Sequence, residues 1–127
     1  MISIEDPGEI PCIQLDVYKE GVLIETINLE NRDIFKFGRR GNTESGGDTV
    51  QLLHESISEV HAALAMDQEK GLVLIDLGSE NGTTLNGIPV ESNVPTPVQQ
   101  KGDIVTFGAS TRSYKVNVDY SRMLKAQ

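Results

Sequence analysis

The sequence predicts an all-β fold, an antiparallel β-sandwich of about ten or eleven strands. The apolar runs in this 127-residue chain are short and often interrupted, which is typical of strands rather than helices. Apolar and polar residues alternate at 13–17 and 114–118, whereas residues 72–75 are continuously apolar, as in a strand deep inside a sandwich. The sequence has no internal repeat and no low-complexity tract, so two packed sheets are the default arrangement.

Ten segments carry the strand pattern, and turn chemistry separates them. The segments are residues 11–18, 22–28, 34–38, 49–52, 61–66, 72–76, 83–85, 88–90, 103–107 and 113–118. Residues 19–21 and 30–33 are typical of hairpin turns, and Asn86-Gly87 is the strongest two-residue hairpin signal in the chain.

Two longer connections are predicted to be irregular. Residues 41–48 are rich in glycine and directly follow a pair of arginines, so we expect a flexible loop that could receive a ligand. Pro95 and Pro97 indicate an irregular connection before the last strand pair.

The length predicts one domain, because the chain can bury a real core but is too short for two. We expect the sandwich to span residues 11–120, between a flexible N-terminal segment at 1–10 and a C-terminal tail at 121–127. Within that tail, Met123-Leu124 could dock as a short helix.

Composition excludes several classes of protein. A single cysteine, Cys12, cannot form an internal disulfide, and with two histidines it cannot supply a zinc site at the usual spacings. We therefore expect no metal and no cofactor.

No stretch approaches the apolar length of a membrane span, and the acidic N-terminus lacks the basic and apolar regions of a signal peptide. We expect an intracellular protein without a membrane partner.

The charge balance argues against nucleic acid as a partner. The formal net charge is −8, whereas duplex binding normally depends on a basic face. The same acidity slows the approach of a phosphorylated ligand. Because the Debye length is about 8 Å at physiological salt, only charges beside the site should affect such a ligand strongly.

Four polar clusters lie between the apolar runs. They are Phe37-Gly38-Arg39-Arg40, Ser58-Glu59-Val60-His61, Asp76-Leu77-Gly78-Ser79-Glu80-Asn81-Gly82-Thr83 and Asn86-Gly87. Together they place arginine, hydroxyl, amide and glycine in loops, without an acid–base couple or a metal-ligand set. These groups are suited to holding an oxyanion rather than to transforming one.

Three residues are candidates for contacting a ligand. Arg39 follows a strand and a glycine, so its guanidinium could leave the loop and bridge two phosphate oxygens, although an isolated Gly-Arg is more often a solvated surface arginine. Ser58 lies before a strand, where its hydroxyl could donate to an anion. Asn81 predicts a tight turn with Gly82, and its amide could also bridge the backbone of an extended peptide. Arg40 could add charge.

A serine near a histidine also raises the possibility of a hydrolase. The sequence lacks the Gly-x-Ser-x-Gly turn of such a nucleophile and an acid that would orient the base. His61 opens an apolar run, so we expect a buried residue that fastens loops by hydrogen bonds to backbone. Turn geometry alone accounts for Thr83 and Asn86, which we assign to the scaffold. We assign no catalytic residue and expect no enzyme.

The ordered pattern Gly-Arg, Ser-x-x-His, Asp-Leu-x-Ser-x-Asn-Gly-Thr and Asn-Gly resembles the forkhead-associated (FHA) domain, a phosphothreonine-binding β-sandwich. The resemblance covers about residues 13–118. It implies that Arg39 and Ser58 contact the phosphate, that Asn81 bridges the peptide backbone, and that His61 holds the recognition loops in place. We also assign Gly38 and Gly82 to the structural support of the loops.

Three further segments resemble a nuclear, splicing-associated subgroup of FHA domains. They are residues 60–64, 74–77 and 107–112. This resemblance implies nuclear partners that carry phospho-Thr-Pro, and it favours the nucleus over the cytoplasm. We expect the domain to act as a monomer.

Two acidic residues depart from the FHA pattern. Glu59 follows the serine where arginine, lysine or asparagine is usual, and Glu80 stands where threonine or serine often contacts phosphate. Both should lie at the phosphopeptide site and oppose a dianion. The sequence therefore predicts a phosphothreonine-dependent peptide-binding module, with a phosphate-independent scaffold on the same fold as the alternative.

Overall fold

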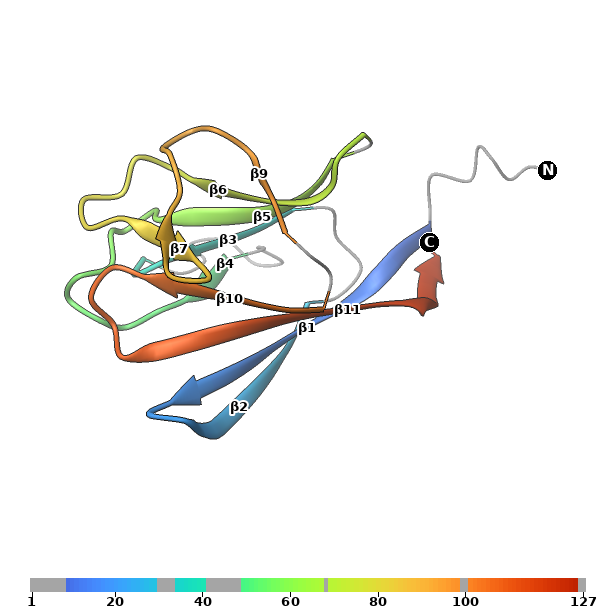
Figure 1. Cartoon of the computed structure of the whole chain (residues 1–127), viewed down its shortest axis with the longest axis horizontal. Helices are drawn as coiled ribbons and strands as arrows, with labels where there is room; N and C mark the ends of the chain where they lie inside the picture. The colour runs from blue at the N-terminus through green and yellow to red at the C-terminus, as the bar shows by residue number, and fades with distance from the viewer. Residues whose placement is uncertain (1–8, 30–33, 41–48, 68, 99–100, 126–127) are drawn as a thin grey trace.

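The computed structural model describes residues 9–29, 34–40, 49–67, 69–98 and 101–125, which form a β-sandwich (Figure 1). Eleven strands are present in these residues, and the structure confirms the predicted all-β sandwich. They are β1 (Glu9–Lys19), β2 (Val22–Leu29), β3 (Ile34–Gly38), β4 (Thr49–Gln51), β5 (Ala62–Asp67), β6 (Gly71–Asp76), β7 (Thr83–Leu85), β8 (Ile88–Pro89), β9 (Thr96–Pro97), β10 (Lys101–Phe107) and β11 (Arg112–Lys125). Among the described residues, no helix is long and apolar enough to span a membrane.

The strands form a six-stranded sheet in the order β2-β1-β11-β10-β7-β8 and a five-stranded sheet in the order β4-β3-β5-β6-β9. The second sheet is mixed rather than purely antiparallel, because β4 runs parallel to β3. Strand β9, where the sequence predicted only an irregular connection, pairs with β6 at the edge of its sheet. An edge strand tolerates Pro97 because proline lacks the N–H that a central strand needs.

The core lies between the two sheets and follows the predicted alternation. In β1, Ile13, Leu15 and Val17 are buried, and Gln14 between them is exposed. Phe107 of β10 stacks on Phe37 of β3, with ring centroids 5.1 Å apart. Since each buried side chain of this size contributes about 1.5–3 kcal/mol, these contacts hold the ends of β3 and β10 together beneath the loops.

The β1–β11 pair is longer than the sequence indicated. Glu9 pairs with Lys125 and Ile10 with Leu124, beyond a register shift whose extra residues lie in β11. The tail expected from residue 121, with its possible helix at Met123-Leu124, is therefore strand as far as Lys125. A paired strand is stable here because each chain segment satisfies the backbone hydrogen-bonding groups of the other.

Two of the predicted hairpin turns are present. Glu20 and Gly21 have φ of 53° and 81° and join β1 to β2. Asn86 and Gly87 have φ of 54° and 82° and join β7 to β8. Positive φ at both central residues is the turn geometry whose twist matches a hairpin. The predicted turn at 30–33 and the loop at 41–48 lie outside the described residues.

Candidate functional site

Three of the four polar clusters of the sequence, all except Asn86-Gly87, meet at one end of the sandwich, at the left of Figure 1. Four connections contribute: residues 39–40 after β3, 52–61 between β4 and β5, 77–82 between β6 and β7, and 108–111 between β10 and β11. Hydrogen bonds between these connections fix their relative positions.

The end of β3 lies against the loop before β5. A Cβ atom added to Gly38 would lie 2.1 Å from the carbonyl oxygen of Glu59, so no other residue fits this approach. Beyond it, the Arg39 N–H donates to the Ser58 carbonyl (3.0 Å) and the Arg40 N–H donates to the Glu59 carbonyl (3.2 Å). Gly38 thus allows two segments distant in sequence to run side by side.

Arg39 and Ser58 keep hydrogen-bond donors available at this contact. The Arg39 Nε donates to the Ile57 carbonyl at 2.9 Å, which orients the guanidinium, and its terminal nitrogens form no salt bridge with a carboxylate of the described residues. The Ser58 Oγ accepts the Glu80 N–H at 2.9 Å, so the hydroxyl still has its own proton to donate. A guanidinium and a hydroxyl with free donors are suited to binding an anion.

Asn81 belongs to the same loop cluster. Its Nδ2 donates to the Ser56 carbonyl at 2.8 Å, while its side chain is exposed at the surface. Beyond this bond, Asn81 has a second amide proton and the Oδ1 acceptor, for which no hydrogen bond to a described residue is found. The structure therefore brings Arg39, Ser58 and Asn81 into one set of connected loops.

The two acidic residues of the pattern occupy different environments. Glu59 forms an ion pair with Arg40, with its Oε1 3.0 Å from Nη2, and both side chains are more than half exposed. Glu80 is also exposed, and its backbone supports Ser58. The expected repulsion by Glu59 is therefore reduced, because its charge is already opposed by Arg40.

His61 joins two of the loops to the core. Its side chain is fully buried, and its Nδ1 accepts the Ser58 N–H at 3.0 Å. The ring proton is therefore on Nε2, which donates to the Gly82 carbonyl at 2.8 Å. That carbonyl also accepts the Gly108 N–H at 2.8 Å, and the ring packs edge-on against Phe107. These contacts have the form of a structural fastener rather than a solvent-facing base.

Sequence analysis gave no role to Asp76, which proves to organise the β6–β7 loop. Its carboxylate is buried and accepts side-chain hydrogen bonds from Ser79 (2.5 Å), Thr83 (2.6 Å) and Ser92 (2.8 Å). The backbone N–H groups of Gly78 and Ser79 also donate to it, each at 3.1 Å. An Asp at the end of an apolar strand with Ser three residues later is a turn signal that could have indicated this role.

Hydrogen bonding keeps the Asp76 carboxylate ionised. Burial raises its pKa, but the bonds from Ser79, Thr83 and Ser92 outweigh burial and leave the pKa below its ordinary value. A carboxylate with a lowered folded-state pKa stabilises the fold above its unfolded pKa, and that stability is lost as the pH falls through the folded pKa.

We expect Asp76→Asn to lower the free energy of unfolding by about 2–4 kcal/mol at neutral pH. Urea denaturation of both proteins from pH 7 to pH 2 tests this. The wild-type advantage should shrink as the pH falls below about 4, because the unfolded carboxylate takes up a proton there while the folded carboxylate, with its lower pKa, still resists protonation. The pKa of Asp67 is also lowered, by the N–H groups of Lys70 and Glu69, but both proteins share that titration. A difference between the two proteins that stays constant with pH would contradict the ionised carboxylate.

Ser56 was also missed, and it connects the β10–β11 turn to the site. Its Oγ accepts the Ala109 N–H at 2.8 Å, and its carbonyl accepts the Asn81 amide. His54 Nδ1 lies 2.7 Å from the same Oγ and accepts the Ser56 N–H at 3.1 Å. No sequence signal marked Ser56, because its partners are distant along the chain.

The remaining predicted support residues lie in the scaffold. Gly82 has φ of 86°, as a tight turn after Asn81 requires. The Asn86 Oδ1 accepts the Ile104 N–H at 2.9 Å, which ties the β7–β8 hairpin to β10. Within the described part of the chain, no group of three or more His, Cys, Asp or Glu side chains is placed to hold a metal ion.

Comparison with known proteins assigns this arrangement to a family. Residues 35–108, more than half of the chain, match the FHA domain. The chain is 39% identical over 105 residues to the human nuclear inhibitor of protein phosphatase 1, covering 82% of this chain and 28% of that protein. It is 35% identical over 100 residues to the Arabidopsis thaliana homologue of the phosphatase 1 regulatory inhibitor subunit, covering 79% of this chain and 26% of the homologue. Of the subgroup that the sequence indicated, these relatives confirm the likeness to the nuclear inhibitor of protein phosphatase 1.

Solved structures agree on the fold. Yeast Pml1p superimposes with a TM-score of 0.71 at 19% identity, covering 92% of this chain and 86% of that one. The FHA domain of TbPar42 superimposes with a TM-score of 0.63 at 35% identity, covering 85% of this chain and 57% of that one.

Proposed function

Because the chain belongs to the FHA domain family, a family of phosphopeptide-binding interaction modules, we propose that it binds a phosphorylated threonine in an extended segment of a partner protein. One observation carries the proposal. Arg39 and Ser58 are joined through their backbones at 3.0 Å, and each side chain keeps donors that no described residue uses. A phosphate provides the charged oxygens that such donors need.

The proposed roles follow from the geometry. Arg39 grips two phosphate oxygens with its terminal nitrogens, and Ser58 donates its hydroxyl proton to a third. Asn81 pairs its free amide proton and Oδ1 with the ligand backbone. Arg40 adds positive charge at the rim. No nucleophile, base and orienting group is assembled among these loops, so the proposal is binding without catalysis.

The relatives extend the proposal to cellular context. The human relative is named a nuclear inhibitor, and from this name we infer a nuclear site of action for this domain. From the subgroup resemblance in the sequence we also infer a phospho-Thr-Pro ligand. We further infer that it acts as a monomer.

Titration with matched peptides tests the proposal. A phosphothreonine peptide should bind, its phosphoserine form should bind about fivefold more weakly, and its unphosphorylated form should bind at least about tenfold more weakly. The unphosphorylated peptide loses the charge-assisted hydrogen bonds, and the phosphoserine peptide loses burial of the threonine methyl, worth about 1 kcal/mol. Isothermal titration calorimetry measures all three. Equal affinities for the three peptides would contradict the proposal.

One observation favours a phosphate-independent scaffold as the second candidate. The Arg40–Glu59 ion pair already neutralises one of the cations near the site, and Glu80 adds a negative charge. A scaffold of this kind would bind its partner equally with and without phosphorylation, so the same titration separates the candidates.

Replacing Glu59 is expected to strengthen binding of the phosphopeptide. Glu59→Arg removes a negative charge, adds a positive one and frees Arg40 from its ion pair. Affinity for the phosphopeptide should therefore increase by a factor between several-fold and about a hundredfold, and the increase should be larger at low salt than at high salt. Glu59→Gln is the matched control, since it frees Arg40 from its ion pair without introducing a positive charge. Its gain in phosphopeptide affinity should be smaller. Affinities measured at two salt concentrations decide the matter. An unchanged Glu59→Arg affinity would mean that the phosphate is not held beside this residue.

A further inference from the structure

The chain contains one Thr-Pro pair and no Ser-Pro pair, and the Thr-Pro pair lies at the surface. Thr96 and Pro97 form β9, which ends the strand order of the five-stranded sheet and pairs with β6 (Figure 1). Residues 91–95 and Pro97 are exposed, and Thr96 is partly exposed. Threonine followed by proline in an exposed segment is the type of substrate that a proline-directed protein kinase modifies.

Few interactions hold β9 in place. It pairs with β6 at two positions, Val73 with Pro97 and Leu74 with Thr96. The Thr96 Oγ1 donates to the Val94 carbonyl at 3.3 Å, a long hydrogen bond at the exposed surface. Pro97 has no N–H to donate to a neighbouring strand. Local opening of such an edge costs much less free energy than global unfolding, so the Thr96 hydroxyl can enter the cleft of a kinase.

Phosphorylation of Thr96 favours the open form of this segment. In the transfer, Thr96 Oγ1 bonds to the γ-phosphorus of ATP, the bond from that phosphorus to ADP breaks, and the hydroxyl proton goes to the base of the kinase. Thr96 is directly opposite Leu74, which belongs to the core, so both side chains are on the inner face of the sheet. A phosphate with a charge of about −2 is unfavourable beside an apolar core. The modified residue therefore turns toward solvent.

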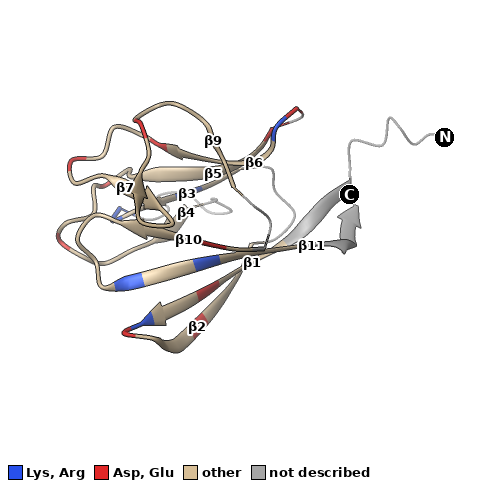
Figure 2. Ribbon diagram, in the orientation of Figure 1, with Lys and Arg blue, Asp and Glu red and all other residues tan. Residues whose placement is uncertain are grey.

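The segment around Thr96 has the form of an extended ligand. Val94 precedes one proline and Thr96 precedes another, and a residue before proline favours extended backbone. A segment restricted in this way loses less conformational entropy on binding. Residues 92–98 have no charged side chain, and Figure 2 shows β9 without acidic or basic residues. A phosphate on Thr96 is therefore the only charge that this segment presents.

The proposed peptide site of the same chain is distant from Thr96. Thr96, Leu74, Leu64 and Phe35 form one cross-strand row over β9, β6, β5 and β3. Three strand spacings, about 14 Å in all, therefore separate Thr96 from β3. Arg39 lies four residues beyond Phe35, about 13 Å further along the strand direction. By this geometry the Cα atoms of Thr96 and Arg39 are about 19 Å apart.

Both ends of the segment are held to β6. The Asn93 N–H donates to the Asp76 carbonyl at 2.7 Å, and the Val98 N–H donates to the Leu72 carbonyl at 2.9 Å. The chain between these two bonds can move outward by at most about 9 Å, half its extended length. The ligand backbone must lie against the site loops for Asn81 to contact it, so a second copy of the chain is the available receptor.

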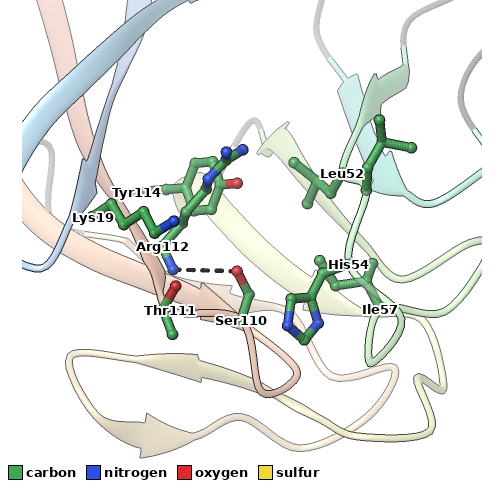
Figure 3. A pocket seen from close by; sticks show the side chains of 9 residues that line it. Lys19, Leu52, His54, Ile57, Ser110, Thr111, Arg112 and Tyr114 are labelled. Atoms are coloured by element: carbon green, nitrogen blue, oxygen red, sulfur yellow. Dashed lines mark hydrogen bonds between the residues drawn. The ribbon is translucent and has the colours of Figure 1, made fainter.

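Local positive charge at the site assists this encounter. Two copies with a net charge of −8 each repel one another, but the Debye length of about 8 Å screens distant carboxylates. Lys19 and Arg112 line a cavity of about 130 Å³ beside the loop from Leu52 to Ile57 (Figure 3). Neither forms a salt bridge with a carboxylate of the described residues. With Arg39, these residues make the receiving end of the domain locally cationic.

We propose that Thr96 is a phosphorylation site for a proline-directed kinase and that the phosphorylated segment binds to the peptide site of a second copy. The inference rests on the proposed function and adds a regulated self-association to it. The contact joins two different surfaces, so it is heterologous and repeats head to tail. The unmodified domain stays monomeric, as inferred above.

A synthetic peptide tests the binding step without the kinase. Residues 90–98 with phosphothreonine at position 96 should bind the wild type at least about tenfold more tightly than the same peptide without phosphate. Arg39→Ala should lose this preference. Fluorescence anisotropy gives the affinities, and an unrelated phosphothreonine peptide serves as the reference ligand.

Treatment of the folded domain tests the modification step. The domain is incubated with ATP and a purified kinase of the cyclin-dependent class, which is proline-directed, and mass spectrometry locates the phosphate. Thr96 should be modified in the wild type, and Thr96→Ala should gain no phosphate. Pro97→Ala is the matched control, since it keeps the hydroxyl but removes the proline, and its modification should be at least about tenfold slower.

Two complementary variants test the assembly. Phosphorylated Arg39→Ala has the ligand without a working site, and unphosphorylated Thr96→Ala has the site without the ligand. Analytical ultracentrifugation should show each alone as a monomer and their mixture as a one-to-one complex. Phosphorylated wild type should form larger head-to-tail species, which phosphatase treatment returns to monomers.

The possible results separate this inference from the proposed function. If the reference peptide binds but the phosphorylated 90–98 peptide does not, or if the kinase leaves Thr96 unmodified, the inference is wrong and the proposed function stands. If phosphorylated wild type stays monomeric and loses the reference peptide, its own site has captured the segment and the second copy is excluded. If the reference peptide does not bind the unmodified wild type, the proposed function is wrong and the inference fails with it.

Discussion

Replacing Arg39 by alanine is expected to weaken phosphothreonine-peptide binding by about a hundredfold or more while the domain stays folded. Two charge-assisted hydrogen bonds are worth about 3–6 kcal/mol together, and alanine removes both. The residue is exposed, and its side chain makes one hydrogen bond to the Ile57 carbonyl, so the cost in stability should be below about 1 kcal/mol. Calorimetric titration and thermal denaturation measure the two effects separately.

Two controls sharpen this result. Arg39→Lys keeps the charge but loses the planar pair of donors, so its affinity should lie between those of the wild type and the alanine variant. Lys70→Ala removes one exposed positive charge far from the site and should leave affinity within about twofold. If Arg39→Ala unfolded the domain, Arg39 would be a structural residue and its assigned role would be wrong.

Replacing His61 by alanine should have the opposite effect, a loss of about 3 kcal/mol or more in the free energy of unfolding. The side chain is fully buried, so its removal leaves a cavity against Phe107. It also leaves the Ser58 N–H without its acceptor, and Gly82 loses one of two donors. Urea denaturation at pH 7 measures the change.

His54→Ala is the natural control, since it replaces the other histidine of the chain. His54 is only partly buried and bonds within its own loop to Ser56, so its loss should cost less than half as much. An unchanged urea midpoint for His61→Ala would contradict the role of His61 as a fastener between loops.

The strands were largely predictable because the pattern that defines them is local. Alternation at residues 13–17 placed the buried face of β1, and Asn86-Gly87 placed the β7–β8 turn. Strand β9 escaped prediction because Pro97 is a turn signal locally, and only the neighbouring β6 makes it a strand. The parallel β3–β4 pair also escaped, because its direction depends on how the intervening chain returns.

The sequence predicted a set of candidate residues but not the hydrogen-bond network that joins their loops. The spacing of Arg39, Ser58 and Asn81 placed each in a loop, and the fold brings those loops together. The role of Asp76 depends on hydroxyls up to sixteen residues away, which only the folded chain reveals. Likewise, the pairing of Glu59 with Arg40 is long-range, and it changes the expected effect of that carboxylate.

The two hydrogen bonds that the Gly82 carbonyl accepts have a consequence for the rate of peptide binding. His61 and the Gly108 amide hold it from two directions, so three connections are locked before any ligand arrives. For the proposed peptide, these three connections then need no ordering step, and the conformational entropy lost on association falls mainly on the incoming peptide. Stopped-flow traces should therefore show a single phase whose rate rises linearly with peptide concentration, and pre-rigidified ligands should gain affinity.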